Sequence, residues 1–356
     1  MSIQTLEIRL SERPTGHVNS KTFVSESISL STTLSSSSGH VLVQVDWLSI
    51  DPAMRGWLDD KRSYLKPVQI GEKMRAQGLG TVIKSSSKTI KVGDIVRGTF
   101  GWCTYAIMAE KDVEPLSLFP GVHELDFLGI LGLPGLTAYF GLFDIAQIKQ
   151  GETLVVSGAA GAVGSVACQL GKLKGAKVIA LAGSDDKVEW LESDLGVHKA
   201  LNYKSPTFIK DFKAAVGYLD VYFDNVGGRI LDLCLTRLKK NARVVLCGAI
   251  SDYISITPGA KRFTMYPDQK PQGLQAYLNL ISQTAKIQGF LVFDYASKFD
   301  GVIREMNQWI SENKLKRRFH IVEGLEKCPE SMNMLFTGAN IGKLVVKVSA
   351  KVSPKL

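Results

Sequence analysis

Short apolar runs alternate with amphipathic stretches through the middle of the chain. Such runs are typical of strands buried on both faces, and apolar residues three and four positions apart are typical of the helices that cover them. Strand-helix alternation of this kind predicts an α/β fold with a doubly wound parallel sheet. Strands are predicted at 154–156, 178–182, 200–203, 221–224, 244–247 and 289–293, and helices at 163–173, 187–195, 207–216, 230–238, 274–284 and 299–312.

A glycine-rich turn joins the first of these strands to its helix. Gly158, Gly161 and Gly164 lie where the chain must turn sharply, let a pyrophosphate approach and pack the helix against the strand. Ala162 and Val163 begin the helix, whose free N–H groups and positive dipole end attract phosphates. The first position of the G-x-G-x-x-G fingerprint is an alanine, but the flanking strands and helix support a dinucleotide site. The turn therefore predicts a Rossmann domain.

The first third of the chain has a different pattern. Short runs of β-branched and aromatic residues between Gly, Pro and Ser predict strands at 41–45, 80–84, 94–97 and 101–108. A helical segment is expected at 128–143, and the β-pattern returns at 319–322 and 344–348. We therefore expect a β-rich domain over 1–127, completed by 318–356, and a Rossmann domain over 128–317.

The end of the second predicted strand distinguishes an NAD site from an NADP site. NAD-binding domains place an Asp or Glu there, whereas this chain has a small Ala-Gly-Ser stretch that leaves room for a 2′-phosphate. Lys187 and Tyr203 follow, and a cation and a hydroxyl suit that phosphate. NADP(H) is the predicted cofactor. NAD remains an alternative if the side chain of Asp185 or Asp186 turns toward the cofactor, although acidic residues are also favoured at the start of a helix.

Two loops of the β-rich domain carry large side chains among Pro and Gly. They span 49–57 and 62–71 and contain Met54, Trp57 and Tyr64. These side chains either line a substrate pocket or fill a loop-rich core, because aromatic residues are common in both settings.

The net charge of +9 raises the question of nucleic-acid binding. Outside the basic run at 314–318, Lys and Arg are interspersed with acidic residues, so a solvated surface and attraction for an anionic cofactor explain the charge better. No apolar run is long enough for a membrane span, and the N-terminus lacks the apolar core of a signal peptide. We expect a cytoplasmic protein without nucleic-acid or membrane partners. The final Pro354-Lys355-Leu356 differs by one residue from a peroxisomal signal, and a frayed tail is the preferred interpretation.

Cysteine and histidine spacing argues against a metal site. The cysteines are scattered, odd in number and never in a C-x-x-C pair, and no histidine has a closely spaced Cys or His partner. A disulfide framework is equally disfavoured. The cysteines are Cys103, Cys168, Cys234, Cys247 and Cys328.

The chain resembles the medium-chain dehydrogenase/reductases, and within them the zinc-free group of prostaglandin reductases, leukotriene dehydrogenases and alkenal double-bond reductases. The resemblance runs nearly end to end. It implies a GroES-like β-rich catalytic domain beside the Rossmann domain, and a homodimer. The motifs that carry it are SIDPAMRGW at 49–57, AAGAVGSVACQLGKLKG at 159–175, AGSDDK at 182–187, NYK at 202–204, YFDNVGG at 222–228, CGAISDY at 247–253 and GANIGKLVVK at 338–347.

The resemblance also implies roles for individual residues. The glycine turn would hold the pyrophosphate, Lys187 and Tyr203 the 2′-phosphate, and Asn340 would reach the cofactor from the other domain. Where many members have Tyr in the D-P-Y-M-R motif this chain has Ala53, so the substrate pocket is expected to differ. The ribose and nicotinamide would be lined by Asn225, Cys247, Gly248, Ala249, Ile250, Ser251, Phe290, Leu291 and Val292.

A metal-free site favours reduction of a C=C bond conjugated to a carbonyl, as in enals and enones. The charge spreads into an enolate, which modest hydrogen-bond donors can stabilise, whereas an alkoxide needs a stronger charge partner. Tyr253 is the predicted catalytic donor, mainly from the resemblance. The Tyr266-x-x-x-Lys270 pattern is set aside because Pro267 disfavours a helix there. A quinone reductase and a non-catalytic cofactor-binding sensor or scaffold remain as alternatives.

Overall fold

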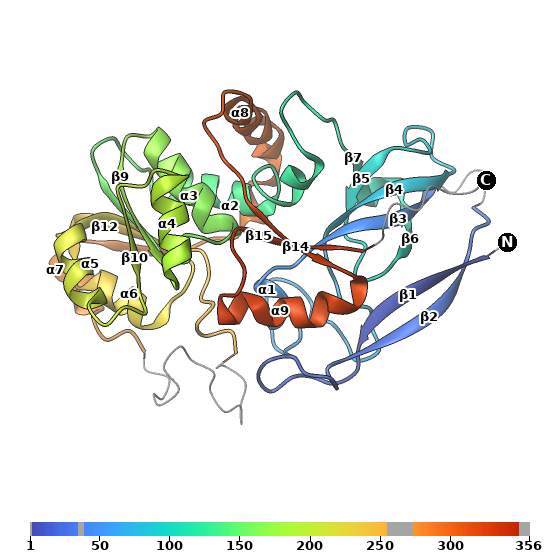
Figure 1. Cartoon of the computed structure of the whole chain (residues 1–356), viewed down its shortest axis with the longest axis horizontal. Helices are drawn as coiled ribbons and strands as arrows, with labels where there is room; N and C mark the ends of the chain where they lie inside the picture. The colour runs from blue at the N-terminus through green and yellow to red at the C-terminus, as the bar shows by residue number, and fades with distance from the viewer. Residues whose placement is uncertain (1, 35–38, 255–272, 349–356) are drawn as a thin grey trace.

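The computed structural model describes residues 2–34, 39–254 and 273–348. A lobe built on a parallel sheet lies beside a β-rich lobe, and the C-terminal strands run into the β-rich lobe (Figure 1). Two features singled out in the sequence lie outside the described residues: the Tyr266-x-x-x-Lys270 pattern and the C-terminal tripeptide.

The parallel sheet has the strand order β10-β9-β8-β11-β12-β13. Every adjacent pair in it is parallel, and the sheet is wound outward in both directions from the first strand, as in a Rossmann domain. The predicted alternation is confirmed. The strands are β8 (Thr153–Val156), β9 (Lys177–Ala182), β10 (Lys199–Asn202), β11 (Leu219–Asp224), β12 (Leu238–Leu246) and β13 (Lys286–Gly289).

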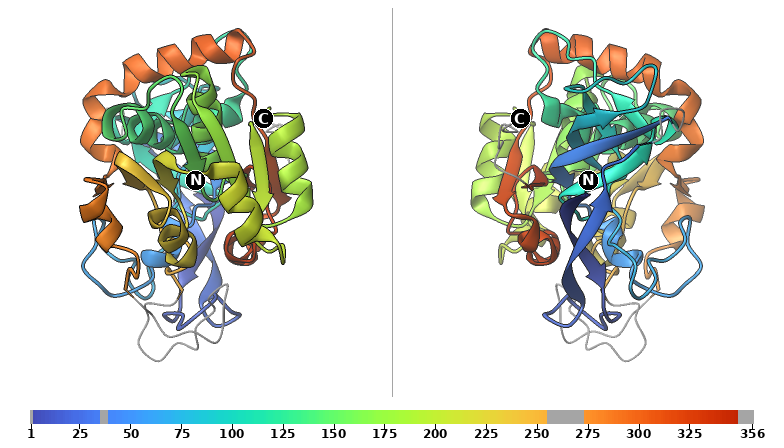
Figure 2. Two further views of the ribbon diagram at one scale, coloured as in Figure 1. Left: turned by 90° about the vertical axis from the view of Figure 1, so that its left-hand side faces the viewer. Right: turned by 90° about the vertical axis from the view of Figure 1, so that its right-hand side faces the viewer.

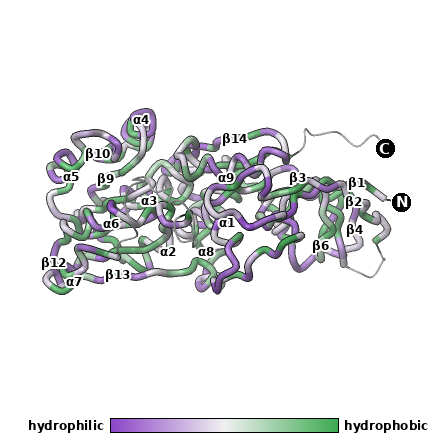
Figure 3. Tube along the Cα trace, turned by 90° about the horizontal axis from the view of Figure 1, so that it is seen from below, coloured by the Kyte–Doolittle hydropathy of each residue, from purple (hydrophilic) through white to green (hydrophobic). Residues whose placement is uncertain are grey.

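Alternate side chains of these strands enter two different cores. Leu154 and Val156 of β8 pack in the core that contains apolar residues of α2, α3, α4 and α8, while Val155 packs with those of α5 and α6. The sheet is therefore covered on both faces. The outer helix α4 is largely hydrophilic (Figure 3). The helices are α2 (Leu133–Phe140), α3 (Ala162–Leu173), α4 (Asp185–Ser193), α5 (Phe208–Val216), α6 (Gly228–Leu235), α7 (Leu278–Ser282) and α8 (Phe299–Ser311), with a π-helical turn η3 (Gly141–Ile145) and the 3₁₀ turns η2 (Glu124–Leu128) and η4 (Val292–Lys298).

The β-rich lobe contains the order β14-β15-β3-β4-β5-β7, with β6 also paired to β3. β1 and β2 form a separate antiparallel ribbon at its outer end (Figure 2). The pairing of β15 with β3 supports the predicted return of the C-terminus, while the boundaries at 127, 128, 317 and 318 stay a prediction. The elements are β1 (Ser2–Leu10), β2 (Phe23–Ser31), β3 (His40–Ser49), α1 (Ala53–Gly56), β4 (Gly78–Ser85), β5 (Ile95–Gly98), β6 (Tyr105–Ala109), η1 (Glu110–Asp112), β7 (Val113–Pro115), β14 (Phe319–Glu323), η5 (Leu325–Lys327), α9 (Cys328–Thr337) and β15 (Lys343–Lys347).

Several predicted elements differ in their bounds from the structure, among them the helix expected at 128–143, which is confined to α2 and the turns on either side of it. The strand expected at 289–293 lies at Lys286–Gly289, because pairing with β12 fixes its register and the apolar run after Gly289 packs as a turn and a 3₁₀ helix. The helix expected at 274–284 is confined to Leu278–Ser282, and the strand expected at 101–108 begins only at Tyr105. None of the described helices has the length and apolar character that a membrane crossing requires.

Candidate active site

The glycine turn links β8 to α3 at the carboxyl edge of the parallel sheet. Gly161 is the N-cap of α3, and Gly158 has a φ of 56°, a left-handed conformation that favours glycine. A Cβ on Gly164 would lie 2.3 Å from the carbonyl oxygen of Gly158, so only glycine lets the helix start this close to the turn. Ala162 and Val163 form the first helical turn, whose N–H groups have no intrahelical partner. This turn fits a pyrophosphate.

A buried carboxylate supports the turn from beneath. Asp224, the last residue of β11, accepts hydrogen bonds at Oδ1 from Ser157 Oγ (3.0 Å) and Tyr222 Oη (2.7 Å). The same oxygen accepts from the N–H groups of Val226 and Gly227, each at 2.9 Å. Burial raises the pKa of Asp224, and these donors oppose the shift. The sequence interpretation missed this network, although an aspartate ending a buried apolar strand is a visible signal.

Asn225 and the loop after β12 are tied to the same two strands. The Asn225 side-chain amide donates to the carbonyl of Ser157 at 2.7 Å. The N–H groups of Cys247 and Gly248 donate to the carbonyl of Asp224 at 2.9 and 3.0 Å. Burial raises the pKa of the Cys247 thiol to about 12, so it stays a neutral wall residue. The structure therefore brings Asn225 and this loop beside the glycine turn.

The loop continues through Ala249, Ile250 and Ser251 to Tyr253. Ile250 N–H donates to the carbonyl of Asn225 at 3.3 Å, and the Tyr253 N–H donates to the carbonyl of Ala249 at 3.2 Å.

Ser251 Oγ fastens the loop by donating to the carbonyl of Val226 at 2.6 Å. The Tyr253 hydroxyl lies 3.3 Å from the point where a Cβ on Gly248 would stand, so the absence of a side chain there makes room for the phenol. Burial raises the pKa of Tyr253, and the carboxylate of Asp224 acts in the same direction. The phenol therefore stays protonated at neutral pH.

Lys187 and Tyr203 both follow Gly183, the residue after β9, and Tyr203 covers this glycine. A Cβ on Gly183 would lie 2.4 Å from the Tyr203 hydroxyl, so the ring stands directly over this glycine. Lys187 is 8% exposed, and its Nζ donates to the carbonyl of Gly338 at 2.6 Å, which leaves further N–H groups for an anion. Burial lowers the pKa of Lys187. The small residue, the cation and the hydroxyl fit a 2′-phosphate.

The two acidic residues that left NAD open lie in the first turn of α4. Asp185 is exposed and accepts a hydrogen bond from the Asn202 amide at 2.8 Å. Asp186 is also exposed, and a hydrogen bond from Ser184 lowers its pKa. Both therefore have the helix-start role that acidic residues favour.

The segment before β15 lies against the glycine turn. Gly342 N–H donates to the carbonyl of Ala160 at 2.8 Å, and Gly342 forms a parallel bridge with Gly161. Asn340 is 8% exposed, and its amide donates to the carbonyl of Gly342 at 3.1 Å. Asn340 is thereby held beside the turn, in the region where the resemblance expects a cofactor contact.

The residues predicted for the substrate pocket separate into two groups. Met54 has no exposed surface and packs in the core of the β-rich lobe. It is therefore a core residue and does not line the substrate pocket that was predicted for it. Trp57 and Tyr64 come together, with Trp57 Nε1 donating to Tyr64 Oη at 3.3 Å. The Tyr64 ring lies 6.4 Å from that of Phe293, centroid to centroid. Loops from both lobes thus build one aromatic wall.

Phe290, Leu291 and Val292 follow the carboxyl end of β13, although not as a strand. Phe290 and Val292 are half-buried against the main core, and Leu291 is exposed. They lie at the edge of the sheet where ligands of such folds bind.

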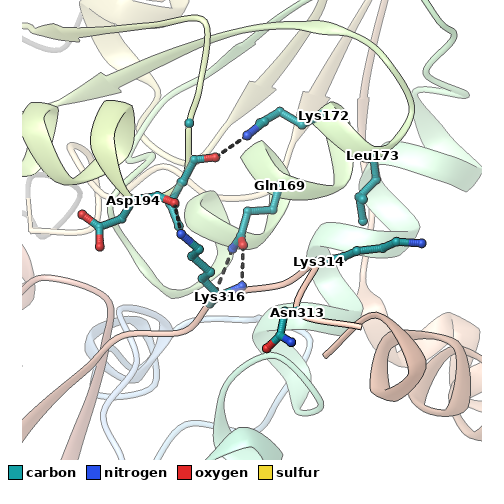
Figure 4. A pocket seen from close by; sticks show the side chains of 9 residues that line it. Gln169, Lys172, Leu173, Asp194, Asn313, Lys314 and Lys316 are labelled. Carbon is teal, nitrogen blue, oxygen red and sulfur yellow. Dashed lines mark hydrogen bonds between the residues drawn. The ribbon is translucent and has the colours of Figure 1, made fainter. Parts of the chain in front are cut away.

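A second hollow of about 300 Å³ lies at the other end of α3. Lys172 and Lys316 point toward it and donate to the carbonyls of Leu195 and Asp194 (Figure 4). Because the glycine turn is at the N-terminus of α3 and Lys172 is at its C-terminus, this hollow is separate from the glycine turn. Among residues 2–34, 39–254 and 273–348, no group of three or more His, Cys, Asp or Glu is placed to hold a metal ion.

The Rossmann sheet and its glycine turn are those of a dinucleotide-dependent oxidoreductase. Residues 7–116 match the family described as the N-terminal domain of oxidoreductase, and residues 162–308 match the family described as zinc-binding dehydrogenase. The NADPH-dependent curcumin reductase of Escherichia coli is 38% identical over 87% of this chain and 88% of its own. Prostaglandin reductase 1 of Bos taurus is 38% identical over 87% of this chain and 89% of its own.

Among solved structures, CurA in complex with NADPH from Vibrio vulnificus superimposes with a TM-score of 0.87 at 35% identity. That comparison covers 97% of this chain and 99% of CurA. The chain belongs to the medium-chain dehydrogenase/reductase family, in the zinc-independent group that includes the prostaglandin and curcumin reductases. The predicted family and fold class are confirmed.

Proposed function

We propose that the protein is an NADP-dependent oxidoreductase that reduces the C=C bond of α,β-unsaturated aldehydes or ketones. The observation that carries the proposal is the placement of Tyr253. Its phenol ends the loop beside Gly248, at the carboxyl edge of the parallel sheet, and burial keeps it protonated. A protonated phenol can donate a hydrogen bond to an oxygen on which negative charge develops, which is what an enolate requires. The names of the curcumin and prostaglandin reductases support the same chemistry.

NADP(H) fits the residues around the glycine turn, and when bound it supplies the hydride. Gly158, Gly161 and Gly164 would receive the pyrophosphate on the N-terminus of α3. Lys187 and Tyr203 would bind the 2′-phosphate beside Gly183 and favour NADP(H) over NAD(H). Asn225, the 247–253 loop, residues 290–292 and Asn340 would orient the ribose and the nicotinamide.

The protein's own contribution to the reaction is charge stabilisation and proton supply. Tyr253 would hold the carbonyl oxygen of the substrate and donate to the developing enolate. It would also deliver or relay the proton that completes the α-carbon. Trp57 and Tyr64 would exclude water from one side of the bound substrate and present a flat apolar surface to it.

The aromatic wall favours one alternative. Flat quinones stack on such rings, so an NADPH-dependent quinone reductase is the second candidate function. Steady-state rates with a 2-alkenal, an enone, a quinone and a simple ketone at equal NADPH separate the two. Preference for the quinone and no turnover of the enal would reject the enal/enone assignment.

Replacing Tyr253 by Phe tests the catalytic role. Loss of one hydrogen bond to a charged oxygen costs about 1.5–3 kcal/mol, so kcat/KM on an enone should fall by about 10- to 150-fold. Tyr218→Phe is the matched control, because Tyr218 is 56% exposed and its ring contacts Arg237. Unchanged kcat/KM in Tyr253→Phe, with an active wild type, would remove this phenol from the mechanism.

A homodimer is also part of the proposal. β13 is an edge strand in the described sheet, and the nearby α7 region exposes apolar side chains at helical spacing. Edge strands and apolar helix faces are commonly covered by a second copy. The exposed side chains are Leu274, Tyr277, Leu278 and Ile281.

The cytoplasmic location stays a prediction.

A further inference from the structure

A buried ammonium group joins the N-terminal and C-terminal parts of the β-rich lobe. Lys343, the first residue of β15, is 3% exposed. Its Nζ donates to Ser49 Oγ at 2.6 Å, to the carbonyl of Ile50 at 3.2 Å and to Asp51 Oδ1 at 2.7 Å. Ser49 in turn donates to the other carboxylate oxygen of Asp51. All three N–H groups of the lysine therefore have acceptors, which fixes the position of its head group.

The acceptors lie at the start of the loop that carries Trp57. Ser49 ends β3, and Ile50 and Asp51 lead directly into α1 and then Trp57. Asp51 also accepts from the N-terminal end of α1, where Met54 N–H donates to its carbonyl at 3.0 Å. Lys343 therefore fixes the start of the loop that leads from β3 to Trp57.

The other side of Lys343 is attached to the glycine turn. Gly342, the preceding residue, donates to the carbonyl of Ala160 and bridges to Gly161. A Cβ on Gly342 would lie 2.1 Å from the carbonyl oxygen of Arg318, and its φ is 74°, so this position requires glycine, while the Lys343 N–H ties the same stretch to the carbonyl of Arg318 at 2.9 Å. One short stretch thus connects the pyrophosphate cradle to the loop that carries the substrate wall.

The sheet itself does not require this ion pair. β15 is already paired to β3 through Val345, Val346 and Lys347. Burying the Lys343 ammonium costs desolvation, and its partner Asp51 is 31% exposed and partly screened by water, so the ion pair adds little net stability. Its contribution is therefore better sought in the geometry that it imposes than in stability.

We propose that Lys343 is a positioning residue that fixes the 49–57 loop relative to the glycine turn, and so sets the substrate wall against the nicotinamide end of the cofactor cleft. The proposal rests on the proposed reductase function. A displacement of about 1 Å between reacting groups can cost about 100-fold in rate, because reaction requires close and aligned contact. Lys343 is too deeply buried to touch the substrate, and it acts through Ser49 and Asp51.

Lys343→Met tests the proposal in the full-length protein. We expect kcat on the fastest acceptor of the wild type to fall by about 10-fold or more, while KM for NADPH changes by less than about threefold. The primary isotope effect on kcat with NADPH deuterated at C4 should increase, because the misaligned hydride transfer becomes more rate-limiting. Lys347→Met is the matched control, since Lys347 lies on the same strand and forms an exposed pair with Glu323 at 3.6 Å. Unchanged kcat and isotope effect in folded Lys343→Met would overturn the proposal.

The double variant Asp51→Asn/Lys343→Met separates positioning from stability. Removing the carboxylate charge should restore most of the Tm that Lys343→Met loses, because no unpaired charge remains. The kcat should stay low, because the cross-link is still absent. Recovery of kcat together with Tm would show a merely structural role. If Lys343→Met does not fold, Asp51→Asn alone gives the same decision, since it weakens the cross-link while Ser49 and Ile50 still accept from Lys343.

Hydrogen exchange distinguishes failure of this proposal from failure of the reductase assignment. NADPH alone should protect amides in 49–57 and 338–343 of the wild type, and protect 49–57 less in Lys343→Met. A wild type that shows this coupling but reduces no enal or enone would reject the assigned reaction and keep the positioning role. Equal protection of 49–57 in both proteins would reject the positioning role.

Discussion

Replacing Lys187 by methionine should change the choice between NADPH and NADH. The Lys187 side chain is 8% exposed, and one of its N–H groups donates to the carbonyl of Gly338 at 2.6 Å. Two N–H groups remain for the 2′-phosphate. A hydrogen bond to a charged group contributes about 1.5–3 kcal/mol. The ratio of kcat/KM for NADPH to kcat/KM for NADH should therefore fall by about 10- to 150-fold.

The ratio is the quantity to measure, because it isolates the phosphate. Methionine also removes the contact with Gly338, and that loss should lower kcat/KM for both cofactors alike. Initial rates with one acceptor and each cofactor in turn give the ratio directly. Lys210→Met, an exposed lysine on α5, is the control and should leave it unchanged.

One result would refute this reasoning. An equal loss with NADPH and NADH would mean that Lys187 supports the segment at Gly338 and does not recognise the 2′-phosphate. The pH dependence adds an internal check. Because burial lowers the pKa of Lys187, the free wild-type enzyme should lose its NADPH preference as rising pH removes the proton from the ammonium.

Further predictions concern the neighbouring residues and the assembly. In Gly183→Ala the new Cβ would lie 2.4 Å from the Tyr203 hydroxyl, so the ring must move and KM for NADPH should rise by about 10-fold or more, as measured by steady-state kinetics. Because burial raises the pKa of Tyr253, the wild-type kcat/KM for an enone should show no Tyr253-dependent decrease between pH 7 and 10; a wild-type limb in that range that Tyr253→Phe abolishes would contradict this. Ile281 is 74% exposed, and Ile281→Glu should convert a dimer into a monomer in light scattering, whereas an unchanged mass would exclude this face from the interface.

Local sequence patterns were sufficient to predict the parallel sheet and the glycine turn. Each strand-helix unit is encoded by a short stretch of apolar spacing, and the glycine turn carries its own requirement for close approach at Gly164. The prediction that Lys187 and Tyr203 bind the 2′-phosphate came from the same kind of pattern, because the strand ends of a Rossmann sheet all face one edge.

Positions that depend on neighbouring elements were predicted less well. Met54 could not be assigned to core or pocket, and only the packing of α1 against the sheet placed it in the core. The strand expected at 289–293 lies earlier because β12 sets its register through pairs such as Leu246 with Gly289. An apolar run alone does not specify which of its residues will pair.

The sequence by itself determined the fold class and the glycine turn, and it predicted a 2′-phosphate site near Lys187, because these follow from residues close together in the chain. The tertiary structure alone decided that Trp57 and Tyr64 form a wall, and that Lys343 joins Ser49 and Asp51 to the stretch held on the glycine turn. The Lys343 contacts join residues from opposite ends of the chain, and the wall also brings the Tyr64 ring within 6.4 Å of the Phe293 ring, centroid to centroid. Their geometry depends on the pairing of β15 with β3 and on how loops from the two lobes meet, properties that no local pattern carries.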